Sequence, residues 1–268
     1  MRKHHATLGV IFFLAALIGV NMSSSASAQS ASAQSSGDKK SVHVVLVHGA
    51  WADGSSWSKV IALLQAQGID AIAVQLPLTT LAGDVATVKR AIALQDGPVL
   101  LAGHSYGGAV ITEAGNDPKV VGLVYVAAFA PDAGESVGSV SKPYPPAPLG
   151  AELRPDAEGF LSITPKGFAE DFAQDLPAKE VQVLWATQGP TNAAVFGTPI
   201  STAAWKTKPS WFVVADKDRA IPPELEKAEA ERLKATTITL PASHLVMISQ
   251  PKEVADLIEK ATKSVAKR

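Results

Sequence analysis

The chain has 268 residues, of which 47% are hydrophobic and 18% charged, enough to enclose one large apolar core. Its 24 basic and 25 acidic side chains give a formal net charge of -1, which excludes the strong field that attracts nucleic acids or anionic membrane surfaces. The chain has no cysteine, so disulfides, thiolate metal sites and cysteine nucleophiles are excluded, and covalent chemistry needs Ser, Thr, Lys or a carboxylate.

The N-terminus predicts a secretory signal peptide. Two basic residues precede an apolar run at residues 8–20, which is shorter than the roughly 20 residues of a membrane span. We expect cleavage after Ala28, with Ala33 as the second choice, and a secreted or periplasmic protein without a stable membrane anchor. Residues 1–28 are then the signal peptide and residues 29–40 a disordered leader. A retained anchor is the alternative, although no stop-transfer pattern follows.

From residue 41 to residue 268, apolar runs alternate with amphipathic segments, as in a parallel sheet covered by helices on both faces. The predicted strands are residues 42–47, 70–74, 99–102, 120–127, 211–215 and 236–240. The predicted helices are residues 57–67, 84–94, 106–116, 223–234 and 251–266. This order indicates one α/β domain with a mostly parallel sheet.

The alternation stops in the segment between residues 131 and 209. This segment is rich in proline and contains helical fragments around residues 168–175 and 179–187. A connection of this length inside a compact domain usually has a functional role. Because it leaves one predicted strand and leads to the next, we expect a cap over the strand ends, where ligands bind in open α/β sheets.

A nucleophile motif occupies residues 103–107, whose sequence is Gly-His-Ser-Tyr-Gly. It follows a predicted strand and opens a predicted helix, which is the structural context that a G-x-S-x-G nucleophile elbow requires. The glycines allow a sharp turn that projects the hydroxyl of Ser105 out of the sheet. The next amide, that of Tyr106, lies at the helix N-terminus and is predicted to be one oxyanion donor.

A serine nucleophile needs a general base, which is usually a histidine. In this arrangement the chain order is serine, acid, histidine, and His244 is the only one of the six histidines that follows Ser105. The others lie in the signal peptide, in the first strand or in turns beside glycine. His43 and His48 are an odd number of positions apart, so on a strand they face opposite sides and predict no metal pair.

The acid that orients the histidine should lie in the loop after the strand at 211–215. Asp216 and Asp218 both occur there. Side chains two positions apart in an extended segment can point the same way, so the spacing alone leaves both open. The other oxyanion donor is expected in the turn at residues 48–51, with the amide of Ala50 as the choice and that of Trp51 as the alternative.

Together, these motifs resemble the α/β-hydrolase fold family, and within it the branch of plant methyl esterases, hydroxynitrile lyases and bacterial single-domain esterases. In that family the acid lies in the pattern small-x-x-Asp-x-x-x-Pro. Ala215 and Pro222 stand at the two ends of that pattern here, so the resemblance favours Asp218 over Asp216. The amide two residues after the histidine of the turn serves the oxyanion in that family, which again implies Ala50.

Some residues differ from those of related enzymes, and these differences narrow the predicted activity. The related plant lyases have threonine at the position of Gly49 and lysine at the position of Leu245, so lyase chemistry is disfavoured. Haloalkane dehalogenases use an aspartate nucleophile, which Ser105 rules out, while serine haloperoxidases remain possible.

The sequence therefore predicts a serine esterase for small or medium carboxylic esters, without a cofactor or metal. The same triad would suit an amidase, a lactonase or a pyrethroid-type hydrolase, and a ligand-binding protein without activity would need a broken triad. The substrate and the oligomeric state stay open. Five aromatic residues are candidates for an apolar substrate pocket, or alternatively for plain core: Trp51, Phe129, Trp185, Phe196 and Trp205.

Overall fold

The structure is a computed structural model that describes residues 41–267. The predicted signal peptide and leader lie outside the described residues. Across this described part of the chain, no helix has both the length and the apolar character needed to cross a membrane.

A six-stranded sheet forms the centre of the domain, with the strand order β2-β1-β3-β4-β8-β9 and all neighbours parallel. Its strands are β1 (His43–Val47), β2 (Ala71–Ala73), β3 (Val99–Ser105), β4 (Val120–Ala128), β8 (Ser210–Ala215) and β9 (Thr236–Leu240). The prediction of a mostly parallel α/β sheet is confirmed, and each of the six predicted strands is present. The strand β3 runs three residues further than predicted, up to the proposed nucleophile.

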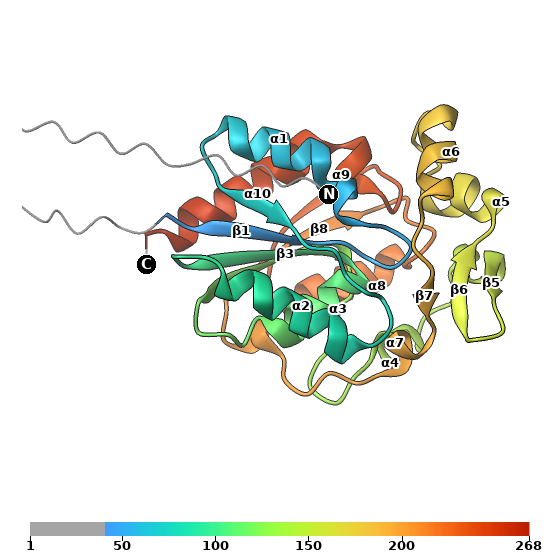
Figure 1. The fold of residues 1–268 in the computed structure, drawn as a ribbon, viewed down its shortest axis with the longest axis horizontal. Helices are drawn as coiled ribbons and strands as arrows, with labels where there is room; N and C mark the ends of the chain where they lie inside the picture. Colours follow the sequence, from blue (N-terminus) through green and yellow to red (C-terminus); the bar gives the residue numbers. More distant parts are fainter. Residues whose placement is uncertain (1–40, 268) are drawn as a thin grey trace, which may run out of the picture. The chain divides into compact units, whose positions relative to one another are not determined.

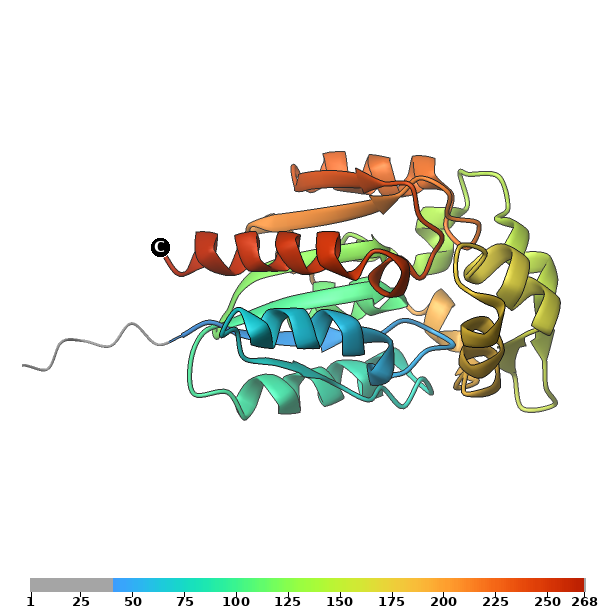
Figure 2. The ribbon, with the colours of Figure 1, turned by 90° about the horizontal axis from the view of Figure 1, so that it is seen from above.

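Helices cover both faces of this sheet. They are α1 (Ser58–Ala66), α2 (Leu81–Ala93), α3 (Tyr106–Ala114), α8 (Pro223–Arg232) and α10 (Pro251–Val265). The pair α1 and α10 lies on one face, and α2 and α3 lie on the other (Figure 1; Figure 2 shows the α1 and α10 face). The helix α2 begins earlier than predicted because the Thr80 side chain caps it, accepting a hydrogen bond from the amide of Gly83 at 3.1 Å.

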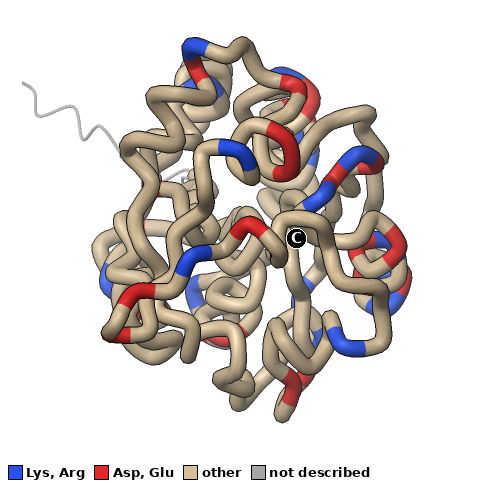
Figure 3. Tube along the Cα trace, turned by 90° about the vertical axis from the view of Figure 1, so that its right-hand side faces the viewer, with Lys and Arg blue, Asp and Glu red and all other residues tan. Residues whose placement is uncertain are grey.

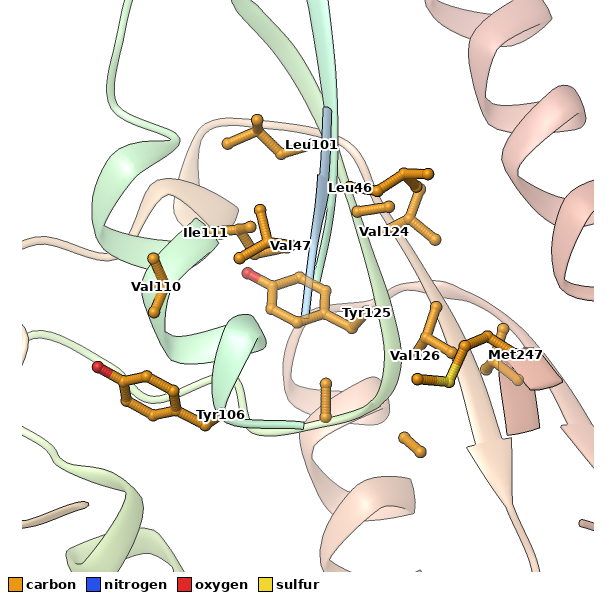
Figure 4. Packing of buried hydrophobic residues seen from close by; sticks show 14 of the residues in the cluster. Leu46, Val47, Leu101, Tyr106, Val110, Ile111, Val124, Tyr125, Val126 and Met247 are labelled. Carbon is orange, nitrogen blue, oxygen red and sulfur yellow. The ribbon is translucent and has the colours of Figure 1, made fainter. Parts of the chain in front are cut away.

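The core lies between the sheet and these helices. Most side chains of β1, β3 and β4 are almost completely buried, and Ile111 of α3 points toward them beside Val47 (Figure 4). Burying an aliphatic side chain of this size contributes about 1.5–3 kcal/mol. The hydroxyl of Tyr125 in this core is satisfied at 2.9 Å by that of Thr112. The elbow region is therefore continuous with this buried core.

The predicted cap segment lies beyond one end of the sheet, on the right in Figures 1 and 2. It contains a small antiparallel sheet, β5-β6-β7, that the sequence did not predict. The cap elements are α4 (Val137–Ser141), η2 (Pro148–Glu152), β5 (Leu153–Pro155), β6 (Phe160–Ile163), α5 (Pro165–Gly167), the π-helical turn η3 (Phe168–Phe172), α6 (Ala178–Ala186), β7 (Thr191–Asn192) and α7 (Ala194–Gly197), followed by η4 (Ala204–Lys206). The predicted helical fragments correspond to η3 and α6. Figure 3 looks onto this end and shows acidic and basic residues interspersed along the described chain, without a block of one sign.

Candidate active site

Ser105 lies at the junction of β3 and α3, in a backbone conformation that few residues adopt. Its φ is 54° and its ψ is -125°, a region that costs about 1–3 kcal/mol for a residue with a side chain. The turn is also too tight for side chains on either side. A Cβ atom at Gly103 would lie 2.5 Å from the carbonyl oxygen of Gly107, and one at Gly107 would lie 2.6 Å from that of His48. The glycines of the motif are therefore required by direct contact of backbone with backbone.

His244 lies between β9 and the short helix α9 (Val246–Ser249), where the sequence predicted the base. Its Nδ1 is 2.5 Å from Oδ2 of Asp218, and both side chains are almost fully buried, at 1% and 0% exposure. A carboxylate only accepts hydrogen bonds, so Nδ1 carries the proton in this pair and Nε2 has a free lone pair. His244 and Ser105 line the same cavity. The arrangement leaves Nε2 able to take a proton from a hydroxyl in that cavity.

The two candidate acids have different surroundings. Asp216 is exposed, whereas Asp218 is buried beside His244. The other carboxylate oxygen of Asp218 accepts from the amides of Ala220 at 2.6 Å and Ile221 at 2.9 Å. Three donors thus converge on one side chain and fix its orientation.

The turn after β1 lies directly against the nucleophile. A Cβ atom at Gly49 would be 2.7 Å from Cβ of Ser105, so only glycine allows this approach. The amide of Trp51 donates to Oγ1 of Thr191 in the cap at 3.2 Å and is occupied. The amide of Ala50 has no acceptor within residues 41–267. The amide of Tyr106 is the first of α3, where a helix leaves its amides without an intrahelical partner. Of the two amides weighed in this turn, Ala50 is therefore the one available to an oxyanion.

His48 supports this turn from behind. Its Nε2 lies 2.9 Å from the amide of Leu76 and its Nδ1 lies 2.8 Å from the carbonyl oxygen of Gly49. An amide donates and a carbonyl accepts, so the ring is neutral with its proton on Nδ1. Burial lowers the pKa of His48, which agrees with this neutral form. His48 is thus a structural histidine that fixes the turn.

His104, the residue before the nucleophile, contacts the proposed base. Its Nε2 is 3.0 Å from the carbonyl oxygen of His244, and the two ring centroids are 4.6 Å apart. The ring is fully buried, and burial holds the pKa of His104 well below its usual value, so it is a neutral donor. The sequence placed His104 only as a turn residue. Its position in the middle of the elbow was the available signal for this contact.

Two buried acidic side chains support the site, and the sequence predicted neither. Asp84 accepts from the hydroxyl of Tyr106 at 2.8 Å and from the amide of Leu78 at 2.9 Å, which fixes the first residue of α3. Glu226 on α8 is fully buried and accepts from the amide of Ala215 at 2.9 Å. Burial, and then the neighbouring Asp218 carboxylate, raise the pKa of Glu226 well above its usual value. Burial thus favours the neutral form of Glu226, which would add no second negative charge beside Asp218.

A cavity of about 290 Å³ opens in front of Ser105 and His244. Most of its wall is apolar and comes from the cap, from the elbow region and from the turn after the acid. These lining residues include Trp51, Phe129, Val137, Leu149, Leu153, Phe196 and Ile221. Three of the five aromatic residues that the sequence suggested are in this wall.

The other two aromatic residues suggested for the pocket do not line this cavity. The indole N–H of Trp185 donates to the carbonyl oxygen of Ile163 within the cap at 3.0 Å. That of Trp205 donates to the carbonyl oxygen of Pro131 at 3.0 Å, and Arg232 lies 5.5 Å from its ring. Each indole N–H thus satisfies a backbone carbonyl outside the wall of this cavity.

The described residues contain no group of three or more histidine, aspartate or glutamate side chains that could hold a metal ion. The polar groups at the apolar cavity include the hydroxyl of Ser105 and the imidazole of His244, whose Nδ1 is bound to a carboxylate.

Comparison with known proteins gives a consistent result. The sequence model of the alpha/beta hydrolase family matches residues 44–257. A carbendazim hydrolyzing esterase of Nocardioides is 27% identical over 79% of this chain and 96% of its own length, and methylesterase 1 of Arabidopsis thaliana is 25% identical over 82% and 95%. The crystal structure of a pyrethroid hydrolase from Sphingobium faniae superposes with a TM-score of 0.72 at 23% identity, covering 85% of this chain and all of that one.

Proposed function

Because the chain belongs to the alpha/beta hydrolase family, whose similar members include esterases, we propose that it hydrolyses small or medium carboxylic esters through an acyl-enzyme. In this proposal Ser105 is the nucleophile, His244 the general base and Asp218 its supporting acid. One observation carries the proposal: a strained serine and a buried histidine, with a carboxylate on its Nδ1, line one apolar cavity.

The acylation step follows from these positions. The hydroxyl oxygen of Ser105 attacks the ester carbonyl while its proton passes to Nε2 of His244. Asp218 keeps the imidazole in the required tautomer and stabilises the imidazolium that forms. His244 then gives the proton to the leaving alcohol, the bond between the carbonyl carbon and the alcohol oxygen breaks, and an acyl-Ser105 ester remains. Water, activated by the same histidine, releases the carboxylic acid.

The developing oxyanion is assigned to the amides of Ala50 and Tyr106. Removing one donor of this kind typically costs about 2.7–4 kcal/mol in the transition state. The support for Ala50 is the occupied amide of Trp51 and the close packing of the turn against Ser105.

The apolar wall of the cavity favours uncharged esters with aliphatic or aromatic groups. Amides, lactones and pyrethroid-type esters are the alternative substrates, because the same triad attacks all of them. The pyrethroid alternative is supported by the similar fold of the pyrethroid hydrolase from Sphingobium faniae. A ligand-binding protein without activity is disfavoured, since the elbow, the histidine and the acid are all intact.

Labelling with an organophosphonate, followed by peptide mass mapping, tests the nucleophile. We expect one phosphonyl group on Ser105 and complete loss of p-nitrophenyl ester hydrolysis, with Ser105→Ala as the inert control. Active protein in which Ser105 stays unmodified would overturn the proposal. A series of p-nitrophenyl esters of increasing acyl length then measures how much of the cavity the acyl group fills.

We also propose export of the protein, from the apolar run and small-residue site that precede the domain. N-terminal sequencing of protein recovered from the periplasm or the medium tests this. The expected first residue is Gln29, and a protein found in the cytoplasm with residues 1–28 still attached contradicts it.

A further inference from the structure

One short cap segment, residues 171–175, contacts both loops that carry the partners of Ser105. The carboxylate of Asp171 lies 2.6 Å from Nε of Arg219, the residue after the acid. The side-chain amide of Gln174 donates to the carbonyl oxygen of Lys217, the residue before the acid, at 2.7 Å. The two contacts bracket Asp218.

The loop of the base is contacted more directly. One carboxylate oxygen of Asp175 accepts from the amide of Ser243 at 2.9 Å, and the other accepts from the hydroxyl of the same serine. Ser243 is fully buried and immediately precedes His244. Both hydrogen-bond donors of Ser243 are thus bound to one cap side chain. The ring of Phe172, in the same cap segment, lies 4.9 Å from the ring of His244.

His244 is therefore held on its two sides by different parts of the domain. Its carbonyl oxygen accepts from the buried His104 of the elbow, which moves with the sheet. Its amino side is tied through Ser243 to Asp175, which is exposed on the cap. A shift of the cap against the sheet would therefore reach the backbone of His244 through Ser243, while the contact with His104 would resist it.

We propose that Asp175 is a positioning residue that sets the place of His244 through Ser243, and so couples the seating of the cap to the reactivity of Ser105. The inference rests on the proposed function, in which His244 is the base. A displacement of about 1 Å at a catalytic group can cost about 100-fold in rate, so loss of this link should affect the chemical step rather than substrate binding.

The test compares Asp175→Ala with Glu180→Ala. Glu180 on α6 also fastens the cap to the sheet domain, through Lys59 of α1 at 2.9 Å. The carboxylate of Glu180 does not bind Ser243 or the neighbours of Asp218, and Lys59 has a second contact of its own, with the carbonyl oxygen of Ile248 in α9 at 3.2 Å. The measurements are kcat and KM for p-nitrophenyl acetate, the rate of phosphonylation of Ser105 by a small phosphonate, and the melting temperature.

For Asp175→Ala we expect kcat and the phosphonylation rate to fall about 10- to 100-fold, with KM changed less than about threefold. Asp175→Asn should recover to within about threefold of the original chain, because an amide can accept from the Ser243 N–H and donate to its hydroxyl. Glu180→Ala should leave both rates unchanged. Ser243→Ala combined with Asp175→Ala should be no slower than Asp175→Ala alone, because both act through one contact.

An unchanged phosphonylation rate in Asp175→Ala overturns the inference. So does a change confined to KM, or an equal loss in Glu180→Ala, since either result assigns Asp175 to the pocket or to general cap stability. Failure of the proposed function looks different: Ser105 of the original chain then stays unlabelled, or Ser105→Ala stays active, whatever Asp175 does.

Discussion

The elbow that carries Ser105 and the loops that carry Asp218 and His244 hold their side chains by different means. At the elbow, backbone packs on backbone: the glycines touch the turn after β1 with no room for a methyl group. In the loops, position depends on side-chain hydrogen bonds, several of which come from the cap. Close packing fixes a position permanently, whereas hydrogen-bonded loops can be adjusted by the element that binds them. Ser105 is therefore positioned by backbone packing, whereas the positions of Asp218 and His244 depend in part on hydrogen bonds from the cap.

The largest expected effect is a loss of kcat on changing Asp218, in one of the two hydrogen-bonded loops. Asp218→Asn should lower kcat for p-nitrophenyl acetate by about 10⁴-fold, because the amide can stabilise the wrong imidazole tautomer. Asp216→Asn is the matched control two residues away, and its exposed side chain should change kcat less than about twofold. Equal losses in the two variants would show that the loop, and not one carboxylate, is what matters.

The next effect tests the packing of the elbow. Gly107→Ala should lower the free energy of unfolding in urea by about 3 kcal/mol, because its Cβ atom would meet the carbonyl oxygens of His48 and Val47 at 2.6 and 2.7 Å. Gly197→Ala in the cap, where no atom lies within 4 Å of the added carbon, should change it by less than about 0.5 kcal/mol. If Gly107→Ala were as stable as the original chain, the claim that backbone packing leaves no room for a methyl group at the elbow would be wrong.

The junction between the two regions should respond to pH. Glu229 on α8 accepts from the amide of Ala130, where β4 leaves for the cap, and burial raises the pKa of Glu229 to about 8 although Arg232 lies 3.2 Å away. The folded pKa of Glu229 lies above its unfolded value of 4.5, so the contribution of this group to stability is fully present below pH 4.5 and is lost as the pH rises to about 8.

The matching experiment measures urea unfolding of the original chain and of Glu229→Gln from pH 5 to pH 8. The stability of the original chain should fall relative to the variant by up to about 1.4 kcal/mol per pH unit. Parallel curves for the two proteins would mean that Glu229 is already ionised throughout, with Arg232 as its effective partner.

The smallest effect concerns the cap as pocket wall. Phe196→Ala should raise KM for p-nitrophenyl hexanoate about tenfold, since the ring lines the cavity beside Trp51 at 5.5 Å. Trp185→Phe serves as the control, because that ring lies outside the cavity, and should change KM less than about twofold. A larger effect of Trp185→Phe would mean that the cap has a second substrate-contacting surface.

Most of the sheet domain could be predicted because four of its strands, β1, β3, β4 and β8, are buried on both faces and read as nearly continuous apolar runs. The elbow was predictable for the same reason, since its motif follows such a run. The cap sheet was not: β5, β6 and β7 are short and partly exposed, so no period of two marks them. Pairing between such strands depends on tertiary contact rather than on local pattern.

Some residues of the site could likewise be predicted from the sequence, and others could not. Chain order alone selected His244, but the spacing of Asp216 and Asp218 could not separate them, because the difference between them is burial. Residue type alone could not place Trp185 and Trp205. An indole suits an apolar pocket, but here each N–H donates to a backbone carbonyl outside the cavity wall. His104 and Asp175 act through contacts across 140 and 68 residues of chain, which no local pattern encodes.

The cavity before Ser105 has a consequence for turnover. Ester hydrolysis converts a neutral substrate into a carboxylate, and the described residues that line this cavity include no lysine or arginine to receive that charge. The partners left to a carboxylate there are His244 and the amides of Ala50 and Tyr106, while the apolar wall removes its hydration without replacing it. We therefore expect the wall that favours a neutral ester to favour release of the charged product.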